Sequence, residues 1–325
     1  MKKHIILFLA GISVLFMANC TPEKQQSNSE ISGELVIFHA GSLSGPLHEI
    51  ADSFNVHYPD VNIKLEASGS VDAARKITDL DREADIMASA DYKVIEELLI
   101  PEFTSWLIKF ASNELALVFN EKSRYASKIN QDNWPEILLR KDVSYGRSDP
   151  NSDPCGYRSV IAIKLAKKYY KKNQFAEKLL NKNKNFIRPK ETDLLALLET
   201  NALDYIFLYR SVAEQHELKY LSLPDSINLG SPQLKKYYST ISTEISGKTP
   251  NEKITIKGEP MVYGITQLND APNPSVAKVF MHFVLSQDKG LKIMENNGQS
   301  SVVPAKQTKY ESIPKDFKQY VRPEN

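Results

Sequence analysis

The stretch ELVIFHAGSLSGPLHEI, residues 34–50, decides the predicted fold because its periodicity changes within a few residues. It begins with a short apolar run typical of a β-strand, continues with glycine and serine, and resumes with apolar residues at helical spacing after Pro46. The stretch VNIKLEASGSVDAARKI, residues 61–77, has the same order. A strand followed by a serine-rich loop and a helix is a building unit of α/β folds.

The same alternation continues along the chain. Strands of this kind, separated by helices, predict βαβ units, mainly parallel sheets and helices on both faces. At 325 residues the chain is long enough for two such lobes. Further strands are predicted at 84–87, 115–120, 143–146, 204–209, 220–223, 253–257 and 260–266, and helices at 46–57, 71–80, 92–99, 157–171, 175–183, 191–200, 274–286 and around 287–296.

The composition is that of a globular protein, with 42% apolar and 25% charged residues and a net charge of +1. The lysines within 164–172 recur at helical spacing, which indicates a solvated helix face and no nucleic-acid partner. Of the two cysteines, Cys155 would be unpaired in an exported protein. Cysteine and histidine spacings match no metal motif, and no nucleophile elbow or phosphate-binding loop occurs, so no enzyme is predicted.

The first twenty residues have the pattern of a targeting signal. Two lysines precede an apolar run over 5–16, which is too short to span a membrane, and the sequence MANC follows. We expect a lipoprotein signal peptide over 1–20, lipid attachment at Cys20 and a flexible polar tether over 21–33. The protein would then be exported and anchored to a bacterial membrane on its periplasmic or extracellular face.

Two loops of the first half suit an anion. In open α/β sheets ligands bind where strands end, and the loops 39–47 and 67–77 both follow a strand and open a helix. Their glycines allow close backbone approach, while serine hydroxyls and free helix-start amides donate hydrogen bonds. Simple capped turns are the alternative interpretation.

Two later loops carry carboxylates and an aromatic residue. In SDPNSDPCGYR, residues 148–158, Asp153 occupies the N-cap position of a helix with Pro154 at its first residue. That helix would bury Ile161, Leu165 and Tyr169. The second loop lies in 188–211, where Glu191 or Thr192 opens a helix and a strand ends at Tyr209. The ordinary roles of these residues are a helix cap for Asp153, a favourable dipole contact for Glu191 and core cover for Tyr209.

Together these segments resemble the substrate-binding proteins of tungstate and molybdate ABC importers, of the WtpA and ModA type. The resemblance spans most of the chain after residue 33. Two of its elements are specific to the tungstate branch, namely GRSDP…DPCGYR within 146–158 and YRSVAEQ within 203–216. The matching stretches are FHAGSLS (38–44), ASGSVDAARKI (67–77), ADIMASAD (84–91), GRSDPNSDPCGYRS (146–159), LDYIFLYRSVAEQH (203–216) and INLGSP (227–232).

The resemblance implies a type II periplasmic-binding-protein fold, with two α/β lobes around a cleft and a two-strand hinge. By analogy, the first lobe would comprise residues 34–117 and 262–325, and the second lobe residues 118–261. The family further implies a monomer without cofactor that binds one tungstate or molybdate oxyanion and delivers it to a membrane permease and its ATPase subunit.

The family also implies a set of ligand-binding residues. The first lobe would contribute Gly41, Ser42 and Ser70, with Ser68 as the alternative to Ser70. The second lobe would contribute Asp153, Pro154, Cys155, Glu191 and Tyr209. In this branch two carboxylates approach the metal itself, and they would be Asp153 and Glu191, with Glu199 and Glu214 as competing carboxylates nearby.

Two carboxylates disfavour an ordinary dianion such as sulfate or phosphate, unless one of the carboxylates is protonated. At ~4 Å and an effective dielectric near 20, each pair of like unit charges costs about 4 kcal/mol. A large tungsten or molybdenum centre can instead accept carboxylate oxygens as ligands. The pair therefore favours a metal oxyanion, while sulfate, phosphate or thiosulfate transport, and an enzyme or receptor on the same fold, are the alternatives.

Overall fold

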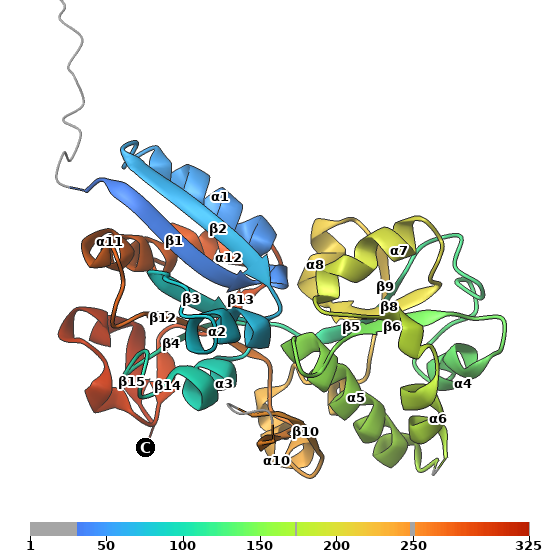
Figure 1. The fold of residues 1–325 in the computed structure, drawn as a ribbon. Coiled ribbons are helices and arrows are strands. Elements are labelled where there is room, and N and C mark those ends of the chain that lie inside the picture. The colour runs from blue at the N-terminus through green and yellow to red at the C-terminus, as the bar shows by residue number, and fades with distance from the viewer. Residues whose placement is uncertain (1–30, 173, 248–250, 325) are drawn as a thin grey trace, which may run out of the picture.

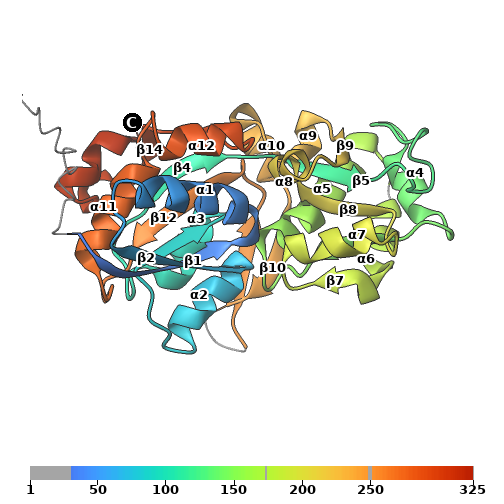
Figure 2. The same cartoon turned by 90° about the horizontal axis from the view of Figure 1, so that it is seen from above.

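The computed structural model describes residues 31–172, 174–247 and 251–324. The predicted signal peptide, Cys20 and most of the predicted tether lie outside the described residues, and β1 already begins at Gly33. Two α/β lobes lie side by side (Figures 1 and 2). Each has its own sheet and helices, as predicted.

The first lobe has a six-stranded sheet in the order β13-β4-β12-β3-β1-β2. Helices α1, α11 and α12 pack together on one face, while α2 and α3 contact the strands from the other (Figure 2). The strands are β1 (Gly33–Ala40), β2 (Val61–Ser68), β3 (Ile86–Ser89), β4 (Ile108–Ser112), β12 (Val262–Gln267) and β13 (Ser300–Ser301), and the helices are α1 (Ser44–Asn55), α2 (Ser70–Thr78), α3 (Tyr92–Val94), α11 (Pro274–Val284) and α12 (Gly290–Asn296). A small parallel pair, β14 (Ala305–Gln307) and β15 (Val321–Pro323), lies near the C-terminus.

The second lobe has a five-stranded sheet in the order β7-β6-β8-β5-β9. Helix α5 packs on one face, and α7 and α8 lie on the other (Figure 1). The strands are β5 (Leu115–Phe119), β6 (Tyr145–Ser148), β7 (Ile187–Arg188), β8 (Tyr205–Tyr209) and β9 (Lys219–Ser222), and the helices are α4 (Trp134–Leu139), α5 (Pro154–Tyr170), α6 (Phe175–Asn181), α7 (Leu195–Glu199), α8 (Arg210–Gln215), α9 (Asp225–Asn228) and α10 (Lys235–Tyr238). Two single turns bear on the site, η1 (Gly41–Leu43) and η4 (Glu191–Leu194).

The sheets are mixed, so the prediction of mainly parallel sheets was wrong. In the first lobe β1 pairs in parallel with β2 and β3, but β12 runs antiparallel to both β3 and β4. In the second lobe β5 runs antiparallel to β8 and β9. The antiparallel strands β12 and β5 each directly follow a crossing between the lobes, so each enters its sheet from the interface and not through a βαβ connection.

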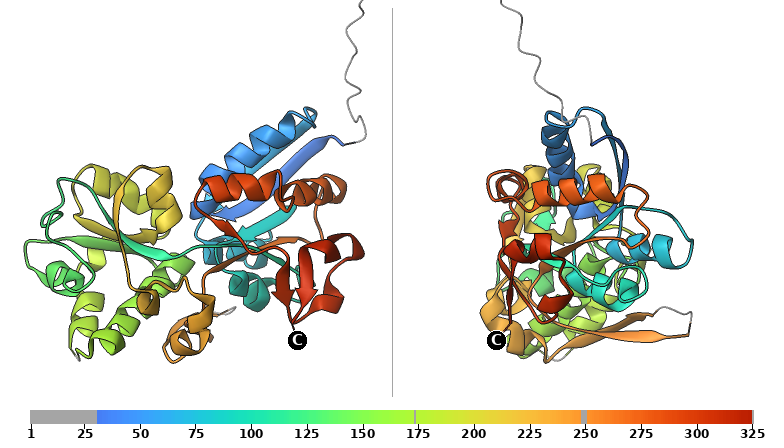
Figure 3. Two further views of the ribbon diagram at one scale, coloured as in Figure 1. Left: turned by 180° about the vertical axis from the view of Figure 1, so that it is seen from behind. Right: turned by 90° about the vertical axis from the view of Figure 1, so that its left-hand side faces the viewer.

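The chain crosses between the lobes twice (Figure 3). Strand β4 belongs to the first sheet and β5 to the second, so the first crossing lies at residues 113–114. The predicted boundary at residue 117 would have divided β5. The return crossing lies between β11 (Lys253–Lys257) and β12, close to the predicted position, and β11 forms a separate hairpin with β10 (Ser242–Ser246).

Burial along the central strands explains this architecture. Every residue of β3, β5 and β8 is buried, as expected for strands covered by helices on both faces. Helix α5 is buried almost throughout its first three turns, and Ile161 and Leu165 are inside as predicted. Tyr169 is 45% exposed, contrary to the prediction, because the last turn of α5 extends beyond the sheet that buries the rest.

Candidate functional site

The two serine-rich loops of the first lobe lie side by side because their strands are neighbours. Strands β1 and β2 pair in parallel, with Ala40 opposite Ser68, so both end at the same edge of the sheet. Turn η1 and helix α1 follow the first strand, and α2 follows the second. This register brings Ser42 and Ser70, both fully buried, to the edge that faces the second lobe.

In the second lobe Asp153 joins two loops. It is the N-cap residue of α5, and its Oδ1 accepts a hydrogen bond from the Cys155 amide at 3.1 Å. Its Oδ2 accepts the amide of Glu191 at 2.9 Å. The predicted capping role is therefore confirmed, with Pro154 at the first helical position. The same contacts place the carboxylates of Asp153 and Glu191 in one cluster.

Glu191 is a buried carboxylate beside Asp153. It begins the turn η4 and is 1% exposed, and among the described residues neither of its carboxylate oxygens has a hydrogen-bond partner. Burial, and secondarily the charge of Asp153, holds the pKa of Glu191 well above its usual range. Burial also raises the pKa of Asp153. A buried acceptor of this kind costs free energy unless a ligand or proton satisfies it.

The lobes are in contact around these carboxylates. Turn η1, which carries Ser42, packs against η4, which begins at Glu191. The Ser152 carbonyl accepts hydrogen bonds from the amides of Val71 and Asp72 at 3.0 and 3.2 Å. A Cβ atom at Gly69 would lie 2.2 Å from that carbonyl oxygen. Glycine is thus required at residue 69 for the lobes to approach this closely.

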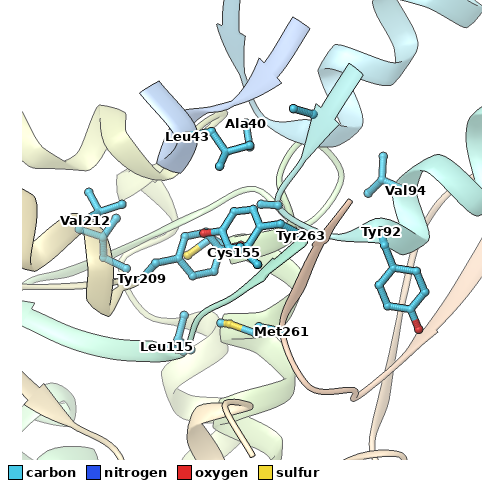
Figure 4. Close-up of a cluster of buried hydrophobic side chains, with 14 of the residues drawn as sticks. Ala40, Leu43, Tyr92, Val94, Leu115, Cys155, Tyr209, Val212, Met261 and Tyr263 are labelled. Atoms are coloured by element: carbon cyan, nitrogen blue, oxygen red, sulfur yellow. The ribbon is translucent and has the colours of Figure 1, made fainter. Parts of the chain in front are cut away.

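Tyr209 and Tyr263 meet between the lobes (Figure 4). Their ring centroids are 6.3 Å apart, and the Tyr263 hydroxyl donates to Ser42 Oγ at 3.2 Å. The Tyr209 hydroxyl accepts from Arg158 Nη1 at 3.0 Å. The sequence prediction named Tyr209 but missed Tyr263. The only signal for Tyr263 was its place in the strand that follows the return crossing.

The remaining predicted residues differ in how free they are to bind. The amide of Cys155 already donates to Asp153, and the pKa of its thiol is raised well above the usual range by burial. The hydroxyl of Ser70 accepts the Ala90 amide at 3.0 Å, while among the described residues the buried Ser68 hydroxyl has no partner. Both serines therefore remain candidates for the ligand-binding role.

The competing carboxylates are elsewhere. Glu199 is exposed at the end of α7, and Glu214 is exposed and pairs with Arg210 at 3.4 Å. Gly41 lies in η1, where a Cβ atom would come within 2.9 Å of the Lys190 side chain of the second lobe. Of the carboxylates weighed from the sequence, only Asp153 and Glu191 share the buried cluster.

The chemistry available here is that of anion binding. Serine hydroxyls, the start of a 17-residue helix and two tyrosines surround a pair of carboxylates. Within the described part of the chain, no group of three or more histidine, cysteine, aspartate or glutamate side chains could hold a free metal ion. No helix in that part is long and apolar enough to cross a membrane.

Two lobes that close on a buried site define a solute-binding protein, and comparison with known proteins gives the family. Residues 35–299 match the model of the family described as bacterial extracellular solute-binding protein, and the chain belongs to this family. A solute-binding protein of Petrotoga mobilis is 52% identical over 99% of this chain and 97% of its own length.

Relatives with named ligands are also similar. The molybdate/tungstate-binding protein WtpA of Pyrococcus abyssi is 42% identical over 96% of this chain and 97% of its own length. Among solved structures, the periplasmic molybdate-binding protein of Azotobacter vinelandii has a TM-score of 0.59 at 15% identity, covering 82% of this chain and 98% of that one. The sulfate-binding protein SubI of Mycobacterium tuberculosis has a TM-score of 0.58 at 13% identity, covering 89% and 92%. At these identities the solved structures establish the fold alone.

Proposed function

We propose that this protein is the solute-binding component of an ABC importer and binds tungstate or molybdate in the cleft between its lobes. The observation that carries the proposal is the buried carboxylate pair of Asp153 and Glu191, of which Glu191 has no hydrogen-bond partner among the described residues. The identity with molybdate/tungstate-binding relatives supports the same ligand class.

When both groups are ionised, the carboxylate pair selects against sulfate and phosphate. A non-metal dianion beside these groups would be repelled by about 4 kcal/mol for each pair of unit charges at ~4 Å and an effective dielectric near 20. Tungsten and molybdenum can expand beyond four oxygen ligands, so the oxygens of Glu191 and Asp153 would become ligands of the metal. Repulsion is then replaced by coordination only for a metal oxyanion.

The oxo groups of the ligand would be held by hydrogen-bond donors from both lobes. We assign this role to the amide of Gly41 and the hydroxyls of Ser42, Ser70 or Ser68, and Tyr209. The start of α5 adds the positive end of its dipole. Binding and release need no nucleophile, so we assign the site no catalytic role.

Export and delivery complete the proposal. The family is extracellular, and the lysines, apolar run and Cys20 at the start of the sequence support a signal peptide and a lipid anchor. A monomer held at the membrane surface would present its closed form to a permease and the associated ATPase. Mass spectrometry of the membrane fraction would detect the lipid on Cys20, and an unmodified Cys20 there would disprove the anchor.

Calorimetry on the full chain tests the ligand. We expect submicromolar binding of tungstate or molybdate that persists in a large excess of sulfate. Glu191→Gln should abolish it, whereas Glu199→Gln, which removes an exposed carboxylate, should bind as the unaltered protein does. Equal affinities for sulfate and tungstate would exclude a metal-oxyanion site.

A further inference from the structure

A buried ion pair joins the two lobes beside the proposed ligand site. Asp91 follows β3 of the first lobe, and Arg158 lies on α5 of the second. Arg158 Nη2 is 2.9 Å from Asp91 Oδ2, and the two side chains are 4% and 10% exposed. The Tyr157 hydroxyl donates to the same oxygen at 2.8 Å. Burial alone would lower the pKa of Arg158, but the carboxylate of Asp91 raises it, so the guanidinium remains charged.

The same guanidinium contacts the residues that carry the site. Arg158 Nη1 donates to the Tyr209 hydroxyl at 3.0 Å and to the Ala90 carbonyl at 2.8 Å. The amide of Ala90 in turn donates to Ser70 Oγ at 3.0 Å. Arg158 therefore links a proposed ligand residue of the second lobe, Tyr209, to the loop that holds a proposed ligand residue of the first, Ser70.

Asp91 is held in place by its own lobe. Its Oδ1 accepts the Lys93 amide at 3.0 Å as the cap of α3, and its amide donates to Ser89 Oγ at 3.1 Å. These contacts are independent of the second lobe. Among the described residues, the side-chain contacts of Asp91 that cross the interface are those with Arg158 and Tyr157. Separating the lobes would break these contacts and leave the loop of Asp91 intact.

The pair lies at the wall of a cavity and would become more hydrated if the lobes parted. Asp91 and Arg158 form part of the wall of a cavity of about 200 Å³, which is also lined by Lys93 and Lys257. Charges that become hydrated on opening carry little penalty in the open form, whereas a charge left unpaired in the closed form would remain buried and costly. The pair therefore affects the closed state far more than the open state.

We propose that Asp91 and Arg158 are positioning residues that stabilise the closed, ligand-bound form and orient Tyr209 toward the ligand. The inference rests on the proposed function, because it assigns a closing contact to that same oxyanion site. Hydrogen bonds to charged groups of this kind correspond to about 10- to 100-fold in an equilibrium constant. Because the pair forms only on closure, its loss should increase the dissociation rate and leave the association rate nearly unchanged.

Stopped-flow measurements of tungstate binding to the full chain test this inference. Asp91→Asn keeps the side-chain shape and the Oδ1 acceptor, and Arg158→Gln removes the guanidinium. We expect each to increase the dissociation rate about 10- to 100-fold, with the association rate within about threefold of the unaltered protein. The double variant should dissociate no faster than Arg158→Gln, because that change already removes the pair with Asp91 together with the contacts to Tyr209 and Ala90.

A carboxylate within one lobe provides the control. Asp204 is buried, pairs with Arg124 at 3.0 Å and contacts no residue of the first lobe in any hydrogen bond or ion pair of the described chain. Asp204→Asn should lower the melting temperature without changing the tungstate dissociation rate. This comparison separates a general loss of stability from a loss of closure.

The outcomes distinguish the two proposals. Tungstate binding by the unaltered protein with unchanged dissociation rates in the folded Asp91→Asn variant overturns the positioning role and leaves the proposed function standing. The positioning role is also overturned if the increases in dissociation rate caused by the two single variants multiply in the double variant, because the two residues would then act independently. If the unaltered protein binds neither tungstate nor molybdate, the proposed function fails, and the inference built on it fails too.

Discussion

Replacing Glu191 by glutamine should stabilise the ligand-free protein at neutral pH while abolishing tungstate binding. Neither oxygen of this buried carboxylate has a hydrogen-bond partner of good geometry among the described residues. The new amide can donate to the Asp153 carboxylate, which interacts with the Glu191 side chain. The buried negative charge, which opposes folding, is lost.

The size of the effect follows from proton linkage. The pKa of Glu191 is raised in the folded protein above an ordinary value of 4.5. Below that pH both the folded and the unfolded states carry the proton. Above it the unfolded state releases the proton first, so the free energy of unfolding falls by about 1.4 kcal/mol per pH unit until the folded-state pKa is passed. The unaltered protein should therefore lose stability relative to Glu191→Gln as the pH rises above 4.5, by about 1.4 kcal/mol for each pH unit up to the folded-state pKa.

Thermal and denaturant unfolding of both proteins without ligand, from pH 4.5 to 8, would measure this difference. For a chain of this size about 1.4 kcal/mol corresponds to roughly 3 °C in melting temperature for each pH unit. Glu199→Gln is the matched control, because its exposed carboxylate should give no pH-dependent difference. Parallel pH profiles of Glu191→Gln and the unaltered protein would refute the buried environment of Glu191. Unchanged tungstate affinity in the variant would refute its role as a ligand.

Three further predictions concern neighbouring residues. Asp153→Ala leaves the buried amides of Cys155 and Glu191 without their acceptor, so the free energy of unfolding should fall by about 2–4 kcal/mol in denaturant titrations. Calorimetry of the same variant should show no tungstate binding. Gly69→Ala places a Cβ atom 2.2 Å from the Ser152 carbonyl oxygen, which would hold the lobes apart. Tungstate affinity should therefore fall at least about tenfold, and X-ray scattering should show a more open form. A variant that stays compact and binds tungstate tightly would contradict this prediction. Cys155 is buried, and burial raises the pKa of its thiol, so a thiol reagent should not label the native protein below pH 8. Rapid labelling of Cys155 below pH 8 would contradict the described packing.

The order of strands and helices was predictable from the sequence because turn and helix-start residues in the loops indicate where each strand ends and each helix begins. Asp153 and the proline that follows it mark the start of α5, whereas α1 and α2 begin at Ser44 and Ser70 without a side-chain cap. Strand directions were not predictable in the same way. The antiparallel course of β5 and β12 depends on where the chain crosses between lobes, and no local pattern at residues 113–114 marks that crossing.

Site residues were predictable to the extent that a local pattern or the family resemblance pointed to them. Asp153 had a capping pattern, and Glu191 stood at a predicted helix start, so both could be weighed before the structure was seen. Tyr263 and Arg158 have no such pattern, since a tyrosine within a strand and an arginine within a helix are ordinary residues. Their importance arises from contacts between segments far apart in the sequence, such as Arg158 with Asp91.

The closed form combines contacts that oppose closure with contacts that favour it. Asp153 and Glu191 both belong to the second lobe, and packing the first lobe against them desolvates the pair, which works against closing an empty cleft. The pairing of Arg158 with Asp91 across the same interface works in the opposite direction. A ligand that coordinates both carboxylates removes the opposing contribution and leaves the favourable one. Closure would then depend on whether the bound anion can accept carboxylate oxygens, so the same residues would select the ligand and signal its presence to the permease.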